Sequence, residues 1–159
     1  MGNTLKINPI TTVIGAEISG IDLSQTLDAE IQDQIYNALM QHLVLFFRDQ
    51  DLSPQAQFDF ATTFGTPVEP HPIYPHLPGY DRVVLLENDG DRPPDTDDWH
   101  TDLTFQPQPP FLSVLHAIDV PEIGGGTPDG AGTSGDRQAP AVCESILHAM
   151  RDWRTQGRK

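Results

Sequence analysis

The chain has 159 residues, of which 37% are hydrophobic, and a formal net charge of −14. This composition excludes wholesale disorder and fits one domain, while the acidic balance argues against nucleic acid and anionic membranes, because polyanions are bound by a surplus of Lys and Arg. Cys143 is the single cysteine, which excludes an internal disulfide. The sequence has neither an apolar leader nor a run of about 20 apolar residues, which predicts a cytoplasmic protein without a membrane span.

The first third of the chain carries signals for short strands followed by a helix. β-Branched residues interrupted by Gly15 and Gly20 predict short strands with tight turns over residues 5–21. Asp28 is a suitable N-cap, and the apolar residues that follow recur every four positions. This pattern predicts a helix over residues 28–42 that lies on a sheet.

The next segment predicts a core strand and a second helix. The apolar run of residues 43–47 is typical of a strand that is covered on both faces. Ser53 as N-cap, Pro54 at the first helical position and Gly65 just past the end bracket the second helix. Residues 66–81 are rich in proline, which predicts an ordered surface loop without a regular element.

The second half of the chain predicts further strands and then a change in composition. Residues 82–87 and 112–118 have strand patterns, and residues 88–98 form an acidic loop between them. The segment that follows is rich in Gly, Ser, Asp and Pro until a short helix is predicted over residues 141–153. The sequence therefore predicts an α+β, mainly β fold with N-terminal helices packed on the sheet.

The chemistry is concentrated in the segment Trp-His-Thr-Asp-Leu-Thr-Phe of residues 99–105. In a strand the side chains of His100 and Asp102 point to the same side, so both can reach one metal ion. Taken alone, a His-x-Asp pair is more often a hydrogen-bonding pair than a metal site. With a second, distant His it is the pattern of the facial triad that holds Fe(II) and leaves positions open for a co-substrate and oxygen.

Several motifs together resemble one enzyme family. They are Trp99-His100-Thr101-Asp102 with Thr104-Phe105, Pro109-Pro110, Gly124-Gly125 and Thr127, and upstream Ile14-Gly15-Ala16-Glu17-Ile18-Ser19-Gly20, Phe47-Arg48-Asp49-Gln50, Phe64-Gly65 and His71-Pro72-Ile73-Tyr74-Pro75-His76. Over about residues 5–127 the chain resembles the taurine dioxygenase family of Fe(II)/2-oxoglutarate-dependent oxygenases. The resemblance implies hydroxylation of an organosulfonate with release of sulfite, with O2 and 2-oxoglutarate as co-substrates.

The resemblance also implies the residues of the iron and 2-oxoglutarate sites. His100 and Asp102 correspond to two of the three iron ligands, and Thr127 to the residue that hydrogen-bonds the 2-oxoglutarate carboxylate. The family takes its third ligand, a His, and a 2-oxoglutarate-binding Arg from a region further along the chain. His116 and His148 are alternative third ligands, although an ordinary surface role is the more common one for such residues.

The resemblance further implies a site for a small anionic substrate, taurine or a related sulfonate. His71 and Tyr74 match the positions that contact the sulfonate, and their donor groups suit an anionic oxygen. Without the resemblance, these side chains are also explained as packing residues of a proline-rich loop. Phe105 matches an aromatic residue of the substrate pocket. Thr96 and Leu103 depart from the family pattern, which leaves a related sulfonate, a sulfate ester or a carboxylate open as the substrate.

The implied domain organisation has two parts. Residues 1–127 correspond to the N-terminal part of the dioxygenase domain, that is, a partial double-stranded β-helix or jelly roll. Residues 128–159 form a divergent tail, interpreted as frameshifted or disordered, so we expect the site to be incomplete in this chain. Unpaired sheet edges would then favour a homo-oligomer.

Two alternatives to this enzyme stay open. One is a catalytically inactive truncated fragment or an interaction module. The other is a zinc-binding or other metal-binding cupin-like protein that uses His71, His76, His100 and Asp102, although these residues lack the compact spacing of a zinc site.

Overall fold

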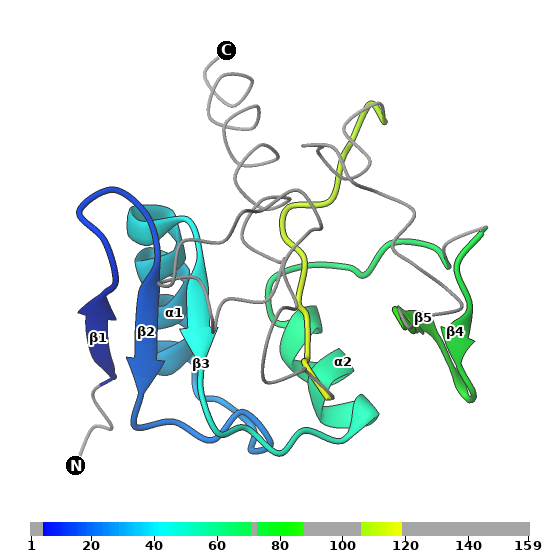
Figure 1. The fold of residues 1–159 in the computed structure, drawn as a ribbon, viewed down its shortest axis with the longest axis horizontal. Helices are drawn as coiled ribbons and strands as arrows, with labels where there is room; N and C mark the ends of the chain where they lie inside the picture. The colour runs from blue at the N-terminus through cyan, green and yellow to red at the C-terminus, as the bar shows by residue number, and fades with distance from the viewer. Residues whose placement is uncertain (1–4, 71–72, 88–105, 119–159) are drawn as a thin grey trace. The chain divides into compact units, whose positions relative to one another are not determined.

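The computed structural model describes residues 5–70, 73–87 and 106–118 of the chain. The chain divides into two compact units, Met1–Val68 and Glu69–Lys159. Within the described residues, the first unit has a sheet of three strands and the second a sheet of two (Figure 1).

The sheet of the first unit has the strand order β1–β2–β3. β1 (Lys6–Pro9) pairs antiparallel with β2 (Ala16–Ser19), and β2 pairs parallel with β3 (Leu45–Phe47). In the turn between β1 and β2, the Thr11 hydroxyl oxygen accepts a hydrogen bond from the backbone N–H of Ile14 at 2.9 Å. The short strands and the tight turn predicted for this stretch are confirmed.

Helix α1 (Ala29–His42) connects β2 to β3. It begins after the N-cap Asp28, whose carboxylate accepts a hydrogen bond from the backbone N–H of Ile31 at 2.9 Å. It ends at Leu43, which has a left-handed φ of 67° and donates its N–H to the carbonyl of Leu39 at 2.7 Å. The helix predicted from the N-cap and the apolar repeat is therefore confirmed.

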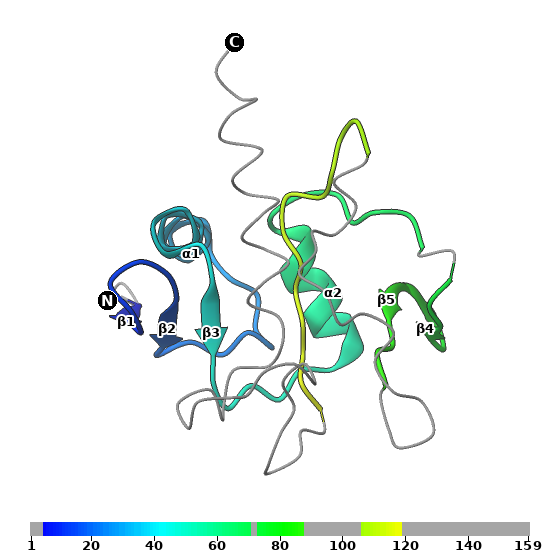
Figure 2. The ribbon, with the colours of Figure 1, turned by 45° about the horizontal axis from the view of Figure 1, so that its top comes forward.

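The core of the first unit lies between α1 and one face of the sheet. Figures 1 and 2 both show the helix against the three strands. In β2 the side chains of Ala16 and Ile18 are 0% and 2% exposed, whereas Glu17 between them is half-buried on the other face. The buried apolar residues are Leu5, Ala16, Ile18, Leu23, Ile31, Ile35, Ala38, Leu39, Val44 and Phe60. Packing of an N-terminal helix on the sheet, as predicted, follows from this burial.

β3 is shorter and less covered than the sequence predicts. The expected strand of residues 43–47 reduces to Leu45–Phe47, and all three of its residues are half-buried. Leu43 is part of the α1 C-cap, and the carbonyl of Val44 accepts a hydrogen bond from the N–H of Ala16 at 3.0 Å before the strand begins. The end of the helix therefore takes up the first residues of the apolar run.

Helix α2 (Pro54–Thr62) follows β3 and has the start signal expected of it. The Ser53 hydroxyl caps the first turn by accepting a backbone hydrogen bond at 3.1 Å. Phe60 packs edge to face against both Phe47 of β3 and Phe64, with ring centroids 5.8 and 5.3 Å apart. These aromatic contacts join α2 to the end of β3.

A two-stranded hairpin is the regular structure described in the second unit. β4 (His76–Leu77) pairs antiparallel with β5 (Tyr80–Val84), and Gly79 in the turn has a positive φ of 83°. The prediction of a loop without regular elements over residues 66–81 is wrong at its end, and β5 begins before the strand predicted over 82–87. The proline-rich composition favoured a loop, and β4, with two residues, is too short to give a periodic pattern.

Residues 106–118 contain neither a helix nor a strand. The prediction of a strand over residues 112–118 is wrong for this part of the chain. An apolar run becomes a strand only where a neighbour pairs with its backbone groups, and no strand within the described ranges pairs with this one. The predicted loop of residues 88–98, the tail of residues 128–159 and its short helix lie outside the described residues.

The coarse fold class is confirmed, with helices and small sheets in the described residues. A jelly roll has about eight strands in two sheets. The double-stranded β-helix therefore stays a prediction. Among the helices of the described part, none is both long and apolar enough to cross a membrane.

Candidate functional site

One of the predicted site residues, Tyr74, lies within the described part of the chain. The others lie outside it: His71, Thr96, His100, Asp102, Leu103, Phe105 and Thr127. The metal, 2-oxoglutarate and substrate roles implied for these residues therefore stay predictions.

Tyr74 lies in a proline-rich segment, and residues on either side of it contact Arg82 of β5 and Leu85, which follows that strand. The tyrosine is half-buried, and the next residue, Pro75, accepts a hydrogen bond on its carbonyl from the N–H of Leu85 at 2.9 Å. At the start of the loop the Glu69 carboxylate accepts from Nη2 of Arg82 at 3.1 Å. Residues 69 and 75, on either side of this predicted substrate contact, thus bind residues 82 and 85.

The Glu69–Arg82 pair was not singled out by the sequence analysis. The two residues are 13 positions apart, and no local periodicity links them. Opposite charges on either side of a proline-rich segment were the available signal, but in an acidic chain a single Glu carries little information.

His76 is the zinc-site candidate that the structure describes. The residue is half-buried in β4, and its Nε2 atom is buried without a hydrogen-bond partner among the described residues. Across residues 5–70, 73–87 and 106–118, no three His, Cys, Asp or Glu side chains are arranged to hold a metal ion. The other members of the proposed zinc set, His71, His100 and Asp102, lie outside these ranges. The zinc-binding alternative therefore gains no support.

His116, one alternative third iron ligand, is half-buried in the irregular segment 106–118. It does not belong to a group of three metal-binding side chains in the described ranges. His148, the other alternative, lies outside them. The strand that would have fixed the direction of the His116 side chain is not formed, so its proposed role has lost its structural basis.

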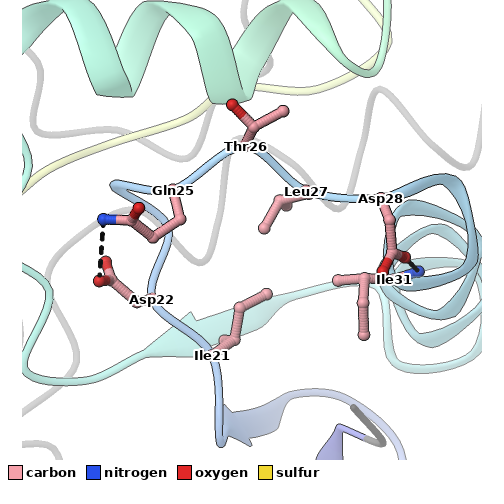
Figure 3. A pocket seen from close by; sticks show the side chains of 7 residues that line it. All are labelled: Ile21, Asp22, Gln25, Thr26, Leu27, Asp28 and Ile31. Atoms are coloured by element: carbon pink, nitrogen blue, oxygen red, sulfur yellow. Dashed lines mark hydrogen bonds between the residues drawn. The ribbon is translucent and has the colours of Figure 1, made fainter. Parts of the chain in front are cut away.

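A surface hollow of about 180 Å³ lies in the first unit, in the segment between β2 and α1 (Figure 3). It is lined by Ile21, Asp22, Gln25, Thr26, Leu27, Asp28 and Ile31. Both carboxylates are already used locally, because Asp28 caps α1 and Asp22 accepts hydrogen bonds from Ser24. The hollow is therefore explained by the structure of the segment that leads into the helix.

Asp22 is the carboxylate of this segment whose ionisation is most affected by its neighbours. Its Oδ1 accepts hydrogen bonds from Oγ and from the backbone N–H of Ser24, at 2.6 and 2.9 Å. These bonds favour the charged form and lower the pKa of Asp22 below its ordinary value of 3.8. The group is thus ionised at neutral pH and serves as a local acceptor.

Comparison with known families gives a match over most of the chain. Residues 6–128 match the family described as "Taurine catabolism dioxygenase TauD, TfdA family". This range contains the eight site residues implied by the resemblance, including the seven that the structure does not describe, whereas the alternative ligand His148 lies outside it.

Curated relatives are similar over the same region. An alkylsulfatase of Acinetobacter baylyi is 43% identical over 124 residues, which cover 77% of this chain and 38% of the relative. An alpha-ketoglutarate-dependent sulfate ester dioxygenase of Pseudomonas putida is 41% identical, covering 77% of this chain and 40% of that protein. The chain therefore spans about two fifths of the length of these relatives.

A solved structure supports the same relationship at the level of the fold. The crystal structure of a taurine dioxygenase from Burkholderia xenovorans is 36% identical and has a TM-score of 0.57, covering 67% of this chain and 38% of that protein. The similarity thus covers two thirds of the present chain.

Proposed function

The chain belongs to the TauD/TfdA family of dioxygenases, and from this premise we propose that the protein acts in the 2-oxoglutarate-dependent oxidation of an organic sulfate ester or sulfonate. The observation that supports this proposal most directly is the match of residues 6–128, which includes the His-x-Asp pair. The structure adds the fold similarity to a taurine dioxygenase.

The substrate class is supported by the names of the relatives. Of the two relatives described above, one is named an alkylsulfatase and the other a sulfate ester dioxygenase, whereas the solved structure is named for taurine. A sulfate monoester and a sulfonate share an anionic group with three terminal oxygens on sulfur. We therefore propose a sulfate ester as the preferred substrate and an organosulfonate as the related one.

The donor chemistry of the predicted metal site fits Fe(II). An imidazole and a carboxylate from His100 and Asp102 are two members of the facial triad that is typical of non-haem Fe(II) oxygenases. When bound, Fe(II) and 2-oxoglutarate supply the activation of O2 that the reaction requires. We propose that these two residues hold the ion and that Thr127 donates a hydrogen bond to the 2-oxoglutarate carboxylate.

The substrate would be held by residues from two loops of the chain. We propose that His71 and Tyr74 donate hydrogen bonds to the sulfate or sulfonate oxygens. The negative charge of these oxygens strengthens such hydrogen bonds. Phe105 would pack against the carbon chain, while Thr96 and Leu103 would set the shape of the pocket. Together these contacts would orient the substrate so that its reacting carbon faces the metal. This carbon is bonded to the ester oxygen in a sulfate ester and to sulfur in a sulfonate.

The proposed reaction is balanced as follows. One oxygen atom of O2 becomes a hydroxyl on the carbon that bears the sulfate, and the other enters succinate as 2-oxoglutarate loses CO2. The hydroxylated carbon then loses its hydroxyl proton, its bond to the sulfate oxygen breaks, and an aldehyde and hydrogen sulfate are released. With a sulfonate, the carbon–sulfur bond breaks instead and hydrogen sulfite is released.

The direct test measures succinate together with sulfate or sulfite. The purified chain would be incubated with Fe(II), 2-oxoglutarate and O2, with hexyl sulfate in one arm and taurine in the other. We expect succinate formation that rises with hexyl sulfate and equals the sulfate released, with a smaller effect of taurine. Succinate that is independent of both substrates, or of added Fe(II), would contradict the proposal.

A further inference from the structure

The hydrophobic core of the described structure lies in one part of the chain. All ten buried apolar residues fall between Leu5 and Phe60, which is within the first unit. The described part of the second unit, residues 69–70, 73–87 and 106–118, contributes none of them, and its Ile73 and Ile118 side chains are 82% and 83% exposed. The apolar burial that stabilises a fold is therefore concentrated in residues 5–68.

Hydrogen bonds between distant positions also close within the first unit. The N–H of Leu5, just before β1, donates to Oε1 of Gln34 in α1 at 3.2 Å. The N–H of Gly15, just before β2, donates to the carbonyl of His42 at the end of α1 at 2.9 Å. These bonds join the first strands to the helix that packs on them, and both partners of each bond belong to the first unit.

The regular structure of the two units differs in what it needs for stability. An isolated two-stranded hairpin is marginally stable in water, whereas a sheet of three strands that packs against a helix can be stable by itself. The first unit has three strands and α1, and the regular structure described in the second unit is the β4–β5 hairpin. Residues 5–68 also reach the length of about 60 residues at which many domains fold alone.

We propose that residues 5–68 form an autonomous folding unit, which keeps its structure when the hairpin of the second unit is disrupted. The eight residues implied for the iron, 2-oxoglutarate and substrate sites all lie after residue 68, between His71 and Thr127. The folding core and the predicted chemistry thus belong to different parts of the chain. Substitutions at the predicted ligands His100 and Asp102 are then expected to change metal binding without unfolding the first unit.

Two glycines provide a matched pair of variants for the test. Gly20 follows β2 in the first unit and has a φ of 84°, and Gly79 lies in the β4–β5 turn and has a φ of 83°. At both positions, no heavy atom of the described residues, apart from the chain neighbours, lies within 4 Å of an added Cβ atom. Gly20→Val and Gly79→Val therefore introduce the same kind of backbone strain without a clash against another part of the chain.

Amide hydrogen exchange of the full chain would be followed by NMR in both variants. Gly79→Val should speed up exchange of the Leu85 amide, which bonds the Pro75 carbonyl, about five- to thirtyfold. The amides of Ile35 and Leu39 in α1 should stay within about twofold of the wild type. Gly20→Val should instead speed up these two amides about five- to thirtyfold, because core amides exchange through unfolding of the unit that contains them.

Two further variants support the interpretation of the glycine pair. Ile35→Val trims a fully buried side chain of the first unit and should speed up exchange of the Leu39 amide about two- to tenfold. Leu85→Pro removes the N–H that bonds the Pro75 carbonyl, so it disrupts the hairpin by a second route. It should likewise leave the exchange of Leu39 unchanged.

Acceleration of the Ile35 and Leu39 amides by more than about twofold in Gly79→Val or Leu85→Pro would overturn the proposal. Unchanged exchange of Leu39 in both Gly20→Val and Ile35→Val would also overturn it, because the buried core would then not determine the stability of the unit. The experiment uses no metal, co-substrate or substrate, so its result does not depend on the proposed function.

Discussion

The side chain of Gln50 joins the segment after β3 to the segment before α1. Its Oε1 accepts a hydrogen bond from the backbone N–H of Leu23 at 2.8 Å, and its Nε2 donates to the carbonyls of Ile21 and Arg48 at 3.2 and 2.8 Å. One amide therefore satisfies three backbone groups, two of which are about 30 residues away in sequence.

Substitution of Gln50 is expected to destabilise the first unit. Gln50→Ala would leave the Leu23 N–H in a partly buried position without its acceptor, and we expect a loss of about 1–3 kcal/mol in the free energy of unfolding. Urea denaturation followed by circular dichroism would measure it. Gln41→Ala, at an exposed position of α1, is the control and should change stability by less than about 0.5 kcal/mol. Equal effects of the two substitutions would show that the bonds of Gln50 do not contribute.

The N-cap of α1 gives a second stability prediction. Asp28→Ala removes the acceptor of the Ile31 N–H and should cost about 1 kcal/mol in the free energy of unfolding. Asp28→Asn keeps an oxygen acceptor and should recover most of this loss. Asp33→Ala, at an exposed position within the same helix, is the control for removal of a negative charge. A larger effect at Asp33 than at Asp28 in the same denaturation experiment would be incompatible with the capping role.

Asp22 predicts a dependence of stability on pH. Because hydrogen bonds from Ser24 lower its pKa in the folded state below 3.8, the ionised carboxylate stabilises the fold. This contribution is fully present above pH 3.8 and is lost as the pH falls through the folded-state pKa. The stability difference between the wild type and Asp22→Asn should therefore shrink as the pH is lowered below 3.8. The stability difference would be measured at pH 2.5 and at pH 6, which lie about one to two units below and above 3.8. The same difference at both pH values would refute the stabilising role of the ionised Asp22.

His76 predicts an unusual response to an apolar substitution. Its Nε2 is buried with no hydrogen-bond partner in the described ranges, and burying such a group costs about 1–3 kcal/mol. His76→Phe keeps a planar ring and removes the unsatisfied nitrogen, so we expect a melting temperature equal to or above that of the wild type. A clearly lower melting temperature would show that Nε2 has a partner that stabilises the fold.

Local signals in the sequence were sufficient for the helices and for the first strands. The N-caps Asp28 and Ser53 and the apolar repeat of α1 act within one or two turns, so a single sequence reveals them. The β-branched run with Gly15 likewise indicated β1, β2 and the turn between them. The positions of these helices and strands are determined by residues that are close together in the sequence.

Features that depend on distant residues could not be predicted in this way. The three hydrogen bonds of Gln50 and the pairing of Glu69 with Arg82 join segments that no local pattern connects. The strand expected over residues 112–118 had the right composition but lacks a pairing partner among the described strands. For the candidate site, the His-x-Asp pattern indicated metal binding, but its geometry depends on a third ligand that spacing alone does not identify.

The central claim is that His100 and Asp102 hold Fe(II) in a form that binds 2-oxoglutarate, which requires that a third ligand completes the site that the sequence predicts to be incomplete. The most direct test is an anaerobic titration of the purified chain with Fe(II) and then 2-oxoglutarate, which follows the visible absorption band of the Fe(II)–2-oxoglutarate chelate. We expect the band to form in the wild type and in the control His42→Ala, to shift on addition of hexyl sulfate, and to be lost in His100→Ala and Asp102→Ala. Absence of the band in the wild type, or its persistence in both ligand variants, would contradict the claim.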